Sequence, residues 1–511
     1  MNRSIYFLVF LLLSILYQQY ELYATSITVS GNSGSTYYLF DQSLNELDSE
    51  IINGFIEVTA GTYIVKLNNC YKQVSINDGD NLIIKTARLC VLGQNNKWFY
   101  VYKNPKLEYL TASRTNSSVD LLEGKYIIKI NNTFYTITLS EEQNIQIQPE
   151  IIKVLGTGLD TYYVYDNNMN ELARSVTNTE LGIFPGEYFV KLNNTIKKIS
   201  VEPNQRYIIK SGTITVTGTG RTEYYVFYDT RTFNIYNNIL DNSFKDMKIA
   251  LNTSINSLKI AAGMDDKPNI SSNSYSNFLN LKQLKNRKTN ESVELFPGDY
   301  LIMLNKTFIT ANVQEGQNTI VKSSTASISG KGNSAFYVYD LSYNLLQSAS
   351  TNDQVELFPG EYVFKLNNTY QTEKVLEGQN KFVKSGTLLV SGYTGTPCYV
   401  YDIDKNEQLC SASINQQIEI FPGNYVLKLR NSFINATVNW DQTTIIKTGT
   451  MIVSGISGKF YVYDCLNYNQ VAYSSVNQKI DLLPGNYIVN YNKKSQVINI
   501  TEEKDAELNF Q

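Results

Sequence analysis

One short motif returns seven times along this chain, and its spacing limits what the chain can fold into. Its fullest form is ELFPGEYVFKLNNT, from Glu356 to Thr369, and close copies begin at Ile183, Leu295 and Ile420. The glycines of the seven copies are Gly61, Gly124, Gly186, Gly298, Gly360, Gly423 and Gly485. Their steps are 62 or 63 residues, except for the step of 112 residues from Gly186 to Gly298. Self-similarity at a fixed period indicates an array of similar structural units.

Each copy of the repeat is rich in short runs that are typical of β-strands. An apolar run such as GTITVTG from Gly212 comes first, and an aromatic run such as TYYVYD from Thr161 comes next. A polar turn, a short run such as ELARS from Glu171 and the motif itself follow, which gives about seven strands per copy. We therefore predict an all-β chain of seven tandem, small antiparallel β-sandwich domains, Ig-like or prealbumin-like, in a rod.

The period also predicts where each domain begins and ends. The connections between copies are almost absent, which favours a semi-rigid series of domains. The predicted ranges are 25–85 for repeat 1, 86–149 for repeat 2, 150–211 for repeat 3, 212–323 for repeat 4, 324–386 for repeat 5, 387–448 for repeat 6 and 449–511 for repeat 7. The longer step places an insert in repeat 4, at about residues 232–285.

The motif has a backbone reason for each of its parts. Tyr362, Phe364 and Leu366 share one face of an alternating run, which is the period of a half-buried antiparallel strand. Asn367-Asn368 fits a tight hairpin, because asparagine tolerates a positive φ. Pro359-Gly360 fits the preceding turn, with the glycine in the left-handed conformation. We therefore interpret the motif as scaffold, and not as a repeated binding site.

The order of strand, Pro-Gly turn, tyrosine and alternating strand resembles PEGA domains and carboxypeptidase-regulatory-like β-sandwich domains. The matching residues are Phe184-Pro185-Gly186-Glu187-Tyr188 and their equivalents, and the match extends over nearly the whole chain after residue 24. Such domains are secreted or surface-attached accessory modules, spacers or binding modules, and the resemblance implies a role of this kind. Repeat 2 departs from the pattern with Leu122-Glu123-Gly124, and repeat 1 departs from it with Thr59-Ala60-Gly61.

The composition excludes several classes of enzyme. The chain has no histidine, so it holds no Ser-His-Asp triad, no Cys-His pair and no histidine-ligated metal. Its 44 Lys and Arg against 47 Asp and Glu give a net charge of −3, which does not favour nucleic acid as a partner. No pair of carboxylates is fixed by its spacing against a base or a substrate. We therefore predict that the protein is not an enzyme and uses no cofactor and no metal.

The amino-terminal segment, residues 1–24, has the pattern of a signal peptide. Arg3 precedes the apolar run from Ile5 to Leu16, which is too short to cross a bilayer comfortably. Leu22-Tyr23-Ala24 is an acceptable cleavage site, with a small residue at its last position. No later run approaches the length of a membrane helix, so we predict no transmembrane span in the mature chain. The expected location is secreted or on the extracellular surface.

Two kinds of covalent modification follow from the predicted export. Cys398 and Cys410 lie on the two arms of a predicted hairpin, and an oxidising compartment favours a disulfide between them. Asn-x-Ser/Thr sequons accept glycans in a eukaryotic secretory pathway. They occur at Asn116, Asn131, Asn193, Asn252, Asn269, Asn290, Asn305, Asn367, Asn435 and Asn499. Four of them belong to the hairpin of the repeat, where turn chemistry is an alternative reason for the same residues.

The insert in repeat 4 has a helical pattern that the rest of the chain lacks. Apolar residues fall on one face at helical spacing at Phe244, Met247, Leu251, Ile255, Leu258 and Ala262. A second, shorter helix is predicted from about Ser276 to Lys285. The insert is therefore either a helical hairpin on the flank of repeat 4 or an element that docks a partner.

The aromatic strands and the polar turns after them are the remaining candidate sites. The candidate binding face consists of Tyr163, Tyr165, Tyr337 and Tyr339. Exposed tyrosines stack on sugars or on another protein, but cross-strand pairing and strand propensity explain the same residues. The turns at Asp166 and Asp402 resemble the first half of a calcium loop, and an Asx-type turn is the alternative that needs no metal.

These features together predict a secreted or surface-displayed repeat protein without catalytic activity, which acts as a structural rod or as an adhesin. One alternative is a multivalent carbohydrate-binding protein that uses its tyrosine faces. Another alternative is a hydrolase with a site at the helical insert of repeat 4. The expected partner is another protein or a cell-surface glycan.

Overall fold

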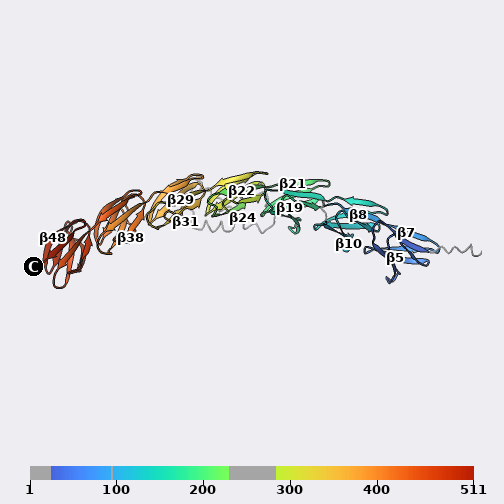
Figure 1. The fold of residues 1–511 in the computed structure, drawn as a ribbon, viewed down its shortest axis with the longest axis horizontal. Coiled ribbons are helices and arrows are strands. Elements are labelled where there is room, and N and C mark those ends of the chain that lie inside the picture. Colours follow the sequence, from blue (N-terminus) through green and yellow to red (C-terminus); the bar gives the residue numbers. More distant parts are fainter. Residues whose placement is uncertain (1–24, 94–95, 229–282, 511) are drawn as a thin grey trace, which may run out of the picture. The chain divides into compact units, whose positions relative to one another are not determined.

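The computed structural model describes residues 25–93, 96–228 and 283–510, and every helix-or-strand element within these ranges is a β-strand. Strands β1 to β49 fall seven to each predicted repeat, which confirms the all-β fold, and Figure 1 colours them along the chain from blue to red. The described part of the chain has no helix long and apolar enough to cross a bilayer. The predicted signal peptide and the predicted helix from Phe244 to Ala262 lie outside the described residues.

Repeat 5 shows the plan that all seven repeats share. Its strands are β29 (Ser324–Ile328), β30 (Ala335–Tyr339), β31 (Leu345–Ser350), β32 (Val355–Leu357), β33 (Gly360–Leu366), β34 (Thr369–Val375) and β35 (Asn380–Val383). One antiparallel sheet has the order β31-β30-β33-β34. The other sheet has the order β32-β29-β35, in which β29 is antiparallel to β32 and parallel to β35. This parallel pair, which joins the first and last strands of the repeat, is not part of the antiparallel prediction.

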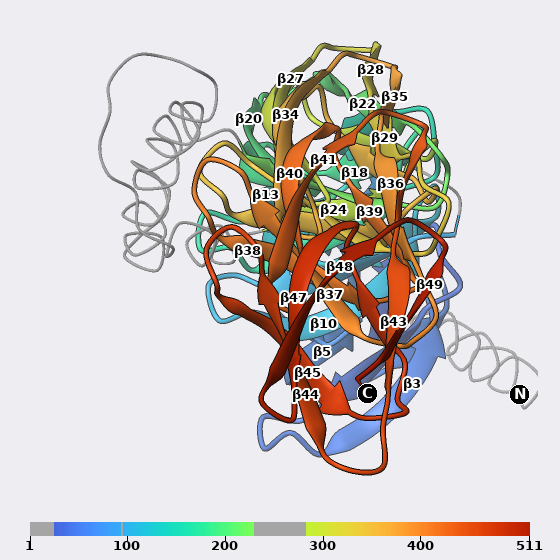
Figure 2. The same cartoon turned by 90° about the vertical axis from the view of Figure 1, so that its left-hand side faces the viewer.

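The same two sheets recur in the other repeats. Their first and last strands are β1 (Ser26–Ser30) and β7 (Asn81–Lys85), β8 (Ala87–Val91) and β14 (Asn144–Ile147), β15 (Glu150–Leu155) and β21 (Arg206–Lys210), β22 (Gly212–Thr217) and β28 (Asn318–Lys322), β36 (Gly386–Ser391) and β42 (Thr443–Lys447), and β43 (Gly449–Ser454) and β49 (Asp505–Asn509). Figure 2 shows β43 beside β49, in agreement with their parallel register. Gly386 lies one residue before the predicted start of repeat 6, and the exact domain boundaries stay a prediction.

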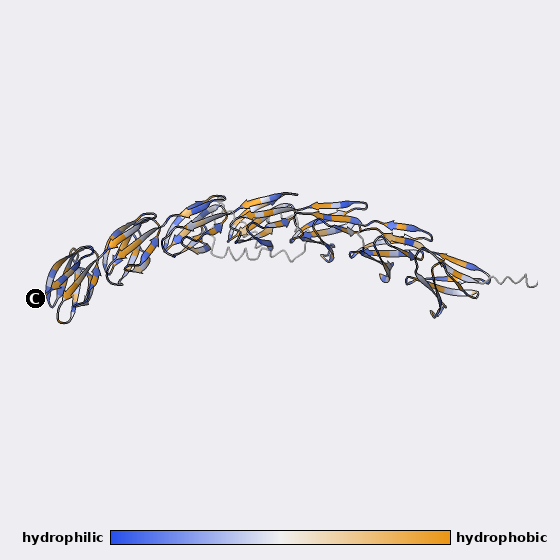
Figure 3. Cartoon of the chain, viewed as in Figure 1, coloured by the Kyte–Doolittle hydropathy of each residue, from blue (hydrophilic) through white to orange (hydrophobic). Residues whose placement is uncertain are grey.

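The core of each repeat lies between its two sheets. In β33, Tyr362, Phe364 and Leu366 point into the cluster of buried residues of repeat 5, while Lys365 on the opposite face is half-exposed. Apolar residues lie mainly on the strands in Figure 3, and hydrophilic residues lie mainly in the turns. Burial of one large apolar side chain contributes about 1.5–3 kcal/mol, so the alternation along each strand is what fixes which face turns inward.

The turns on either side of β33 agree with the prediction at one end and correct it at the other. Asn367 and Asn368 have φ angles of 47° and 58°, which confirms the tight hairpin after the strand. Gly360 has no positive φ, so the prediction of a left-handed glycine is wrong. A Cβ atom at Gly360 would lie only 3.0 Å from the hydroxyl oxygen of Tyr362. Glycine is therefore favoured at this position, because a side chain would require the Tyr362 ring to shift.

The insert of repeat 4 ends before the predicted position. β24 (Gln283–Lys288) pairs antiparallel with β23 (Glu223–Tyr228), and Leu284 is buried. The predicted second helix is therefore wrong for its last three residues, Gln283 to Lys285, and the rest of that helix lies outside the described residues. The chain divides into two compact units, the first made of 1–212 with 294–296 and the second of 213–293 with 297–511.

Candidate functional site: the junctions between repeats

The residues that recur in the motif meet where one repeat joins the next, and we call each of these contact regions a junction. The first hairpin asparagine of a repeat donates a hydrogen bond to the backbone of the following repeat. In the first unit, Asn68, Asn131 and Asn193 donate through Nδ2 to the carbonyl oxygens of Asp120, Gly182 and Glu294, at 2.8–2.9 Å. In the second unit, Asn305 and Asn367 donate in the same way to Glu356 and Glu419, at 2.9 and 2.8 Å. The acceptor is in each case the residue four positions before the motif glycine.

An apolar side chain two positions before the motif glycine enters the core of the preceding repeat, and we call it the plug. Leu122, Phe184 and Phe296 pack in the clusters of repeats 1, 2 and 3 in the first unit, and Phe421 and Leu483 pack in those of repeats 5 and 6 in the second. Each of these plugs is 3% exposed or less. A repeat therefore completes its core with a residue of its successor, and each plug contributes about 1.5–3 kcal/mol of burial.

The plug is held in place by a threonine of the preceding hairpin. The backbone N–H of Phe184, Phe296, Phe358 and Phe421 donates to Oγ1 of Thr133, Thr195, Thr307 and Thr369, at 3.0–3.2 Å. The Thr369 hydroxyl in turn donates to the carbonyl of Leu366 at 2.6 Å. Asparagine and threonine of the hairpin are thus both used in the junction, which gives the Asn-x-Thr sequence a structural role.

The motif tyrosine fixes the turn that carries the plug. The hydroxyls of Tyr126, Tyr188, Tyr362, Tyr425 and Tyr487 donate to the plug carbonyls of Leu122, Phe184, Phe358, Phe421 and Leu483, at 2.5–2.8 Å. Burial raises the pKa of Tyr188 and of Tyr425 to about 12, so these hydroxyls remain protonated donors at neutral pH. The tyrosine is therefore a brace within its own repeat, and at Gly186, Gly360 and Gly423 it leaves little room for a Cβ atom.

A buried carboxylate completes five of the junctions. These carboxylates belong to Asp120 and Glu294 in the first unit and to Glu356, Glu419 and Asp481 in the second, and each residue is 4% exposed or less. Each accepts hydrogen bonds from backbone N–H groups in the loop between the first two strands of the preceding repeat, and four of them also accept from a hydroxyl elsewhere in that repeat. We call this set of bonds the clamp. Glu419 Oε1 accepts from the Gly332 N–H at 2.7 Å, and Oε2 accepts from the Ser334 N–H at 3.3 Å and the Thr351 hydroxyl at 3.1 Å.

The other four clamps use the same kinds of donor. Asp120 accepts from the N–H groups of Asn32 and Ser33, and Glu294 accepts from the Thr157 N–H and the Ser211 hydroxyl, at 2.5–2.9 Å. Glu356 accepts from the Thr219 N–H and the Ser323 hydroxyl, and Asp481 accepts from the N–H groups of Tyr393 and Thr394 and the Thr448 hydroxyl, at 2.5–3.0 Å. Backbone amides and hydroxyls therefore provide the hydrogen bonds to these buried carboxyl groups, and such bonds are strong where the carboxyl is ionised.

Electrostatics support an ionised Glu419. Burial raises the pKa of this carboxyl, but the hydrogen bonds from Gly332, Ser334 and Thr351 outweigh burial and place the pKa below its ordinary value. Both oxygens of Glu419 have partners, whereas Asp120 Oδ1 and Glu294 Oε2 are buried without a hydrogen bond. The clamp at Glu419 is accordingly among the best satisfied, because a carboxylate is stabilised by each donor that replaces water.

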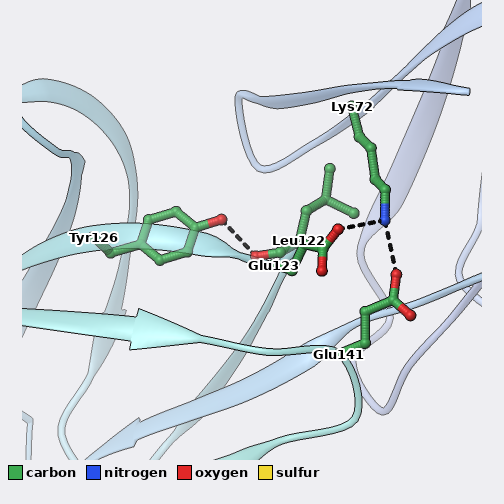
Figure 4. A network of polar contacts seen from close by, with 5 residues as sticks. All are labelled: Lys72, Leu122, Glu123, Tyr126 and Glu141. Atoms are coloured by element: carbon green, nitrogen blue, oxygen red, sulfur yellow. Dashed lines mark hydrogen bonds and ion pairs between the residues drawn. The ribbon is translucent and has the colours of Figure 1, made fainter.

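An exposed ion pair adds to the junction between repeats 1 and 2. Figure 4 shows Lys72 of repeat 1 with Glu123 and Glu141 of repeat 2, at 2.8 and 2.7 Å from Nζ. Partial burial lowers the pKa of Lys72, but the two carboxylates outweigh burial and raise it. Exposed pairs contribute about 0–1 kcal/mol, so this pair is secondary to the Leu122 plug beside it, whose carbonyl accepts from Tyr126 in the same figure.

Repeats 1 and 7 depart from the pattern of the other repeats. Tyr491 ends β47 (Gly485–Tyr491), where the other repeats have Leu or Ile, and its hydroxyl donates to the Ser457 carbonyl at 2.9 Å. Phe510 packs edge-on against Tyr491, with ring centroids 5.7 Å apart, so repeat 7 closes its core with its own residues. In repeat 1 the plug position holds Thr59 and the carboxylate position holds Glu57, and both are exposed.

The predicted tyrosine face lies on the outer side of the four-stranded sheets. Tyr163 and Tyr165 are half-buried neighbours in β16 (Thr161–Tyr165), with ring centroids 6.3 Å apart, and Tyr337 and Tyr339 are arranged alike at 6.5 Å. Both pairs point away from the core of their repeat. The structure thus brings each pair together on one face, and binding of a ligand there stays a prediction.

A more exposed ring and a lysine, which the sequence analysis missed, lie beside Tyr337. Tyr370 in β34 is 50% exposed, and Lys365 Nζ lies 5.9 Å from the Tyr337 ring centroid and 5.7 Å from that of Tyr370. Repeat 1 has the same arrangement, with Lys66 at 5.6 Å from the rings of Tyr38 and Tyr71. The sequence feature that could have indicated this cluster is the lysine that recurs in the motif strand, because alternation places that lysine on the face opposite the core.

The two cysteines of the predicted disulfide are free in the structure. Cys398 lies opposite Ala412 in the sheet, and Cys410 lies opposite Val400, so the two thiols occupy diagonal positions. The Cys398 Sγ contacts the Ala412 carbonyl at 3.1 Å, and burial raises the pKa of both thiols, which favours their protonated forms. A disulfide between Cys398 and Cys410 stays a prediction for the oxidised chain.

The structure describes eight of the ten sequon asparagines, in three settings. Asn131, Asn193, Asn305 and Asn367 use Nδ2 in junctions, and Asn116 and Asn290 use it to bind the carbonyls of Gly93 and Gly218. Asn435 and Asn499 are exposed on β41 (Ser432–Val438) and β48 (Lys494–Ile500). Asn252 and Asn269 lie outside the described residues. A glycan replaces a hydrogen on Nδ2, so the junction asparagines are poor acceptors in the folded chain, and use of any sequon stays a prediction.

The polar turns after the aromatic strands are Asx-type turns. Asp166 Oδ1 accepts from the N–H groups of Asn168 and Asn170, and Asp402 Oδ1 accepts from those of Asp404 and Lys405, at 2.8–3.0 Å. The hydrogen bond from the Asn170 side chain is the largest cause of a lowered pKa at Asp166. These contacts confirm the turn interpretation, since the carboxylates are engaged by their own loops.

Comparisons with known proteins do not place the chain in a family. No family model matches it, and no curated protein matches it. Among solved structures, the TIE protein of Bacillus anthracis has 10% identity over 82% of this chain and 72% of that chain, at a TM-score of 0.11. The major pilin subunit of Bacillus cereus has 9% identity over 37% of this chain and 98% of that chain, at 0.12. The eight N-terminal Ig domains of Down Syndrome Cell Adhesion Molecule have 9% identity over 96% of this chain and 87% of that chain, at 0.11. Similarities this weak carry no argument about function, and the resemblance to PEGA domains stays a prediction.

Proposed function

We propose that this chain is a secreted or surface-displayed structural protein that spans a distance and has no catalytic role. The observation that carries the proposal is the use of the recurring side chains. The motif tyrosine braces the turn, the plug fills the preceding core, and the hairpin Asn and Thr bind the next repeat. What the sequence repeats is therefore the connection between units, which favours a function that depends on their number and alignment.

The physics of such an array supports a spacer. A repeat that contacts only its neighbours adds a nearly fixed increment of length, and its stability is shared with those neighbours. A plug, a backbone hydrogen bond and a clamp contact the preceding repeat at different points, as Phe421 and Glu419 illustrate for repeat 5. Several separated contacts restrict rotation between two units more than a single contact does.

The test is the dependence of length on repeat number. We would compare residues 25–511 with variants that lack residues 324–386 or 324–448, and measure the maximum dimension by small-angle X-ray scattering. The first deletion removes one repeat and the second removes two, so the second should shorten the particle by twice as much as the first. Deletion of residues 232–282 is the control, since it removes a similar number of residues without removing a repeat and should leave the length unchanged. A dimension that does not change with repeat number would contradict the proposal.

Adhesion is a second candidate function, and the outer sheet face favours it. Tyr337, Lys365 and Tyr370 place two rings and a cation together, a set that stacks on a sugar or pairs with a carboxylate. Binding of residues 25–511 to a glycan array and to intact cells should fall in a variant with Tyr337→Ser and Tyr370→Ser. Equal binding by this variant and the original chain would remove the outer face of repeat 5 from consideration.

A hydrolase at the insert is a third candidate function. Residues 25–93, 96–228 and 283–510 hold no group of three or more His, Cys, Asp or Glu placed to bind a metal. The insert itself lies outside the described residues, so this alternative stays a prediction. Hydrolysis of glycosides, esters or peptides by residues 25–511, lost on deletion of residues 232–282, would establish it.

A further inference from the structure

One junction in the first unit lacks the clamp. Between repeats 2 and 3, the residue four positions before the motif glycine is Gly182, where the clamped junctions have Asp or Glu. A second part of the clamp is also missing. Ser211, Ser323 and Thr448 donate hydroxyl hydrogen bonds to their carboxylates, and the equivalent residue here is Pro149, which has no hydroxyl.

The remaining contacts of this junction are intact. Asn131 donates to the Gly182 carbonyl at 2.8 Å, and the Phe184 N–H donates to Thr133 at 3.1 Å. The Phe184 plug is 1% exposed, and its ring stacks on Tyr135 with centroids 5.2 Å apart. Among the described residues, repeat 3 is therefore attached to repeat 2 through the plug and the hairpin, and position 182 carries no carboxylate to accept hydrogen bonds from repeat 2.

We propose that the junction between repeats 2 and 3 is a built-in compliant joint, about which these two repeats bend more widely than repeats joined by a clamp. Apolar burial of a plug resists separation but is non-directional, so it tolerates rotation about the buried ring. The clamp adds directional, charge-assisted hydrogen bonds at a second point and therefore restrains the angle. Gly182 and Pro149 remove that restraint and leave the attachment in place.

Space for a side chain exists at the key position. A Cβ atom at Gly182 would meet only the Pro149 Cβ, at 3.5 Å, which is an ordinary van der Waals contact, and Gly182 has no positive φ. Close packing therefore does not force a glycine here, in contrast to Gly360 beneath its tyrosine. Because position 182 tolerates a side chain, the missing carboxylate can be restored by substitution and its effect measured.

The measurement is the width of a spin-label distance distribution across two equivalent junctions of the full chain, with the five native cysteines replaced by alanine. One label pair is Thr138→Cys with Ser200→Cys, across the joint, and the matched pair is Lys374→Cys with Thr437→Cys, across the clamped junction of repeats 5 and 6. All four positions are exposed and lie fourteen residues after their motif glycines. We expect the first distribution to be at least twofold wider than the second. Equal widths would overturn the proposal.

Restoring the clamp gives the decisive comparison. Gly182→Glu with Pro149→Ser should narrow the first distribution to the width of the second. Gly182→Ala with Pro149→Ser supplies the Cβ and the hydroxyl without the carboxylate, and it should leave the first distribution wide. Narrowing in the alanine variant, or none in the glutamate variant, would refute a role for the carboxylate. The reverse change, Glu419→Gly, should widen the second distribution. The melting temperature of the other repeats should match that of the original chain, which would show that the variant remains folded.

Discussion

Replacing Glu419 by Gln keeps the shape of the side chain and removes the charge at the centre of a clamp. The carboxylate accepts hydrogen bonds from the N–H groups of Gly332 and Ser334 and from the hydroxyl of Thr351, at 2.7–3.3 Å. A glutamine amide has one acceptor oxygen and turns an NH₂ group toward the remaining donors. At least one of the three hydrogen bonds is therefore lost, and the others become neutral.

The magnitude follows from the difference between charged and neutral hydrogen bonds. A hydrogen bond to a charged group contributes about 1.5–3 kcal/mol, and a neutral one contributes about 1 kcal/mol. Relief of the desolvation cost of a buried charge offsets part of the loss. We therefore expect Glu419→Gln to weaken the closed state of the loop around Gly332 by about 2 kcal/mol, a factor of about 30 in its opening equilibrium.

Hydrogen exchange of the full chain reads this equilibrium directly, because a protected amide exchanges through local opening. The amides of Gly332 and Ser334 should exchange about 30-fold faster in Glu419→Gln at neutral pH. Glu57→Gln is the matched control, since Glu57 occupies the same place in repeat 1 but is exposed. Unchanged exchange at Gly332 and Ser334 in Glu419→Gln, or an equal change at the same amides in the control, would refute the reasoning.

Three further predictions concern the same junction and its motif. The folded pKa of Glu419 lies below its ordinary value of 4.5, so the clamp is fully present above pH 4.5 and is lost as the pH falls through the lower folded value. After correction for intrinsic exchange rates, hydrogen exchange of the loop around Gly332 should therefore accelerate on acidification in the original chain. In Glu419→Gln the corrected rate should not depend on pH. Phe421→Ala removes a buried plug and should lower the free energy of unfolding by about 3–5 kcal/mol. Thermal unfolding of this variant should begin at a lower temperature than that of Thr59→Ala. If both variants begin to unfold at the same temperature, the role of Phe421 as a plug would be contradicted. Tyr362→Phe removes the donor to the Phe358 carbonyl and should cost about 1–3 kcal/mol, measured as a lower midpoint of chemical unfolding, whereas an unshifted midpoint would show that the brace contributes little.

Local patterns predicted the strands because alternation is itself local. The run from Tyr362 to Leu366 carries its own inward and outward residues, and Asn367 and Asn368 have the predicted left-handed turn. The parallel pairing of β29 with β35 was not predictable in this way, since the two strands lie at opposite ends of the repeat and neither shows its partner in its sequence. Gly360 was predicted to adopt a left-handed conformation because glycine is frequent in turns. The structure instead shows that the Tyr362 ring lies close to the position of a Cβ atom there.

The clamp could have been found in the sequence only by comparing the repeats with one another. An Asp or Glu precedes the motif glycine by four residues in every repeat except the third, but within one repeat Glu419 looks like an ordinary exposed end of a strand. Its burial comes from residues of the preceding repeat, 87 positions away at Gly332. Asn367 was missed for the same reason, since the turn explained its backbone and left its side-chain amide without a role.

The plug also implies an order in which the repeats complete their cores during export. If the chain leaves an export channel amino end first, repeat 5 emerges before Phe421, so its interior stays open to water until much of repeat 6 has followed. Repeat 7 is exempt, because Tyr491 and Phe510 come from its own sequence. Completion of the core should thus follow emergence by about half a repeat wherever a plug comes from the next repeat, whereas repeat 7 needs no later plug. A chain stalled during export should therefore expose one incomplete core to proteases and chaperones.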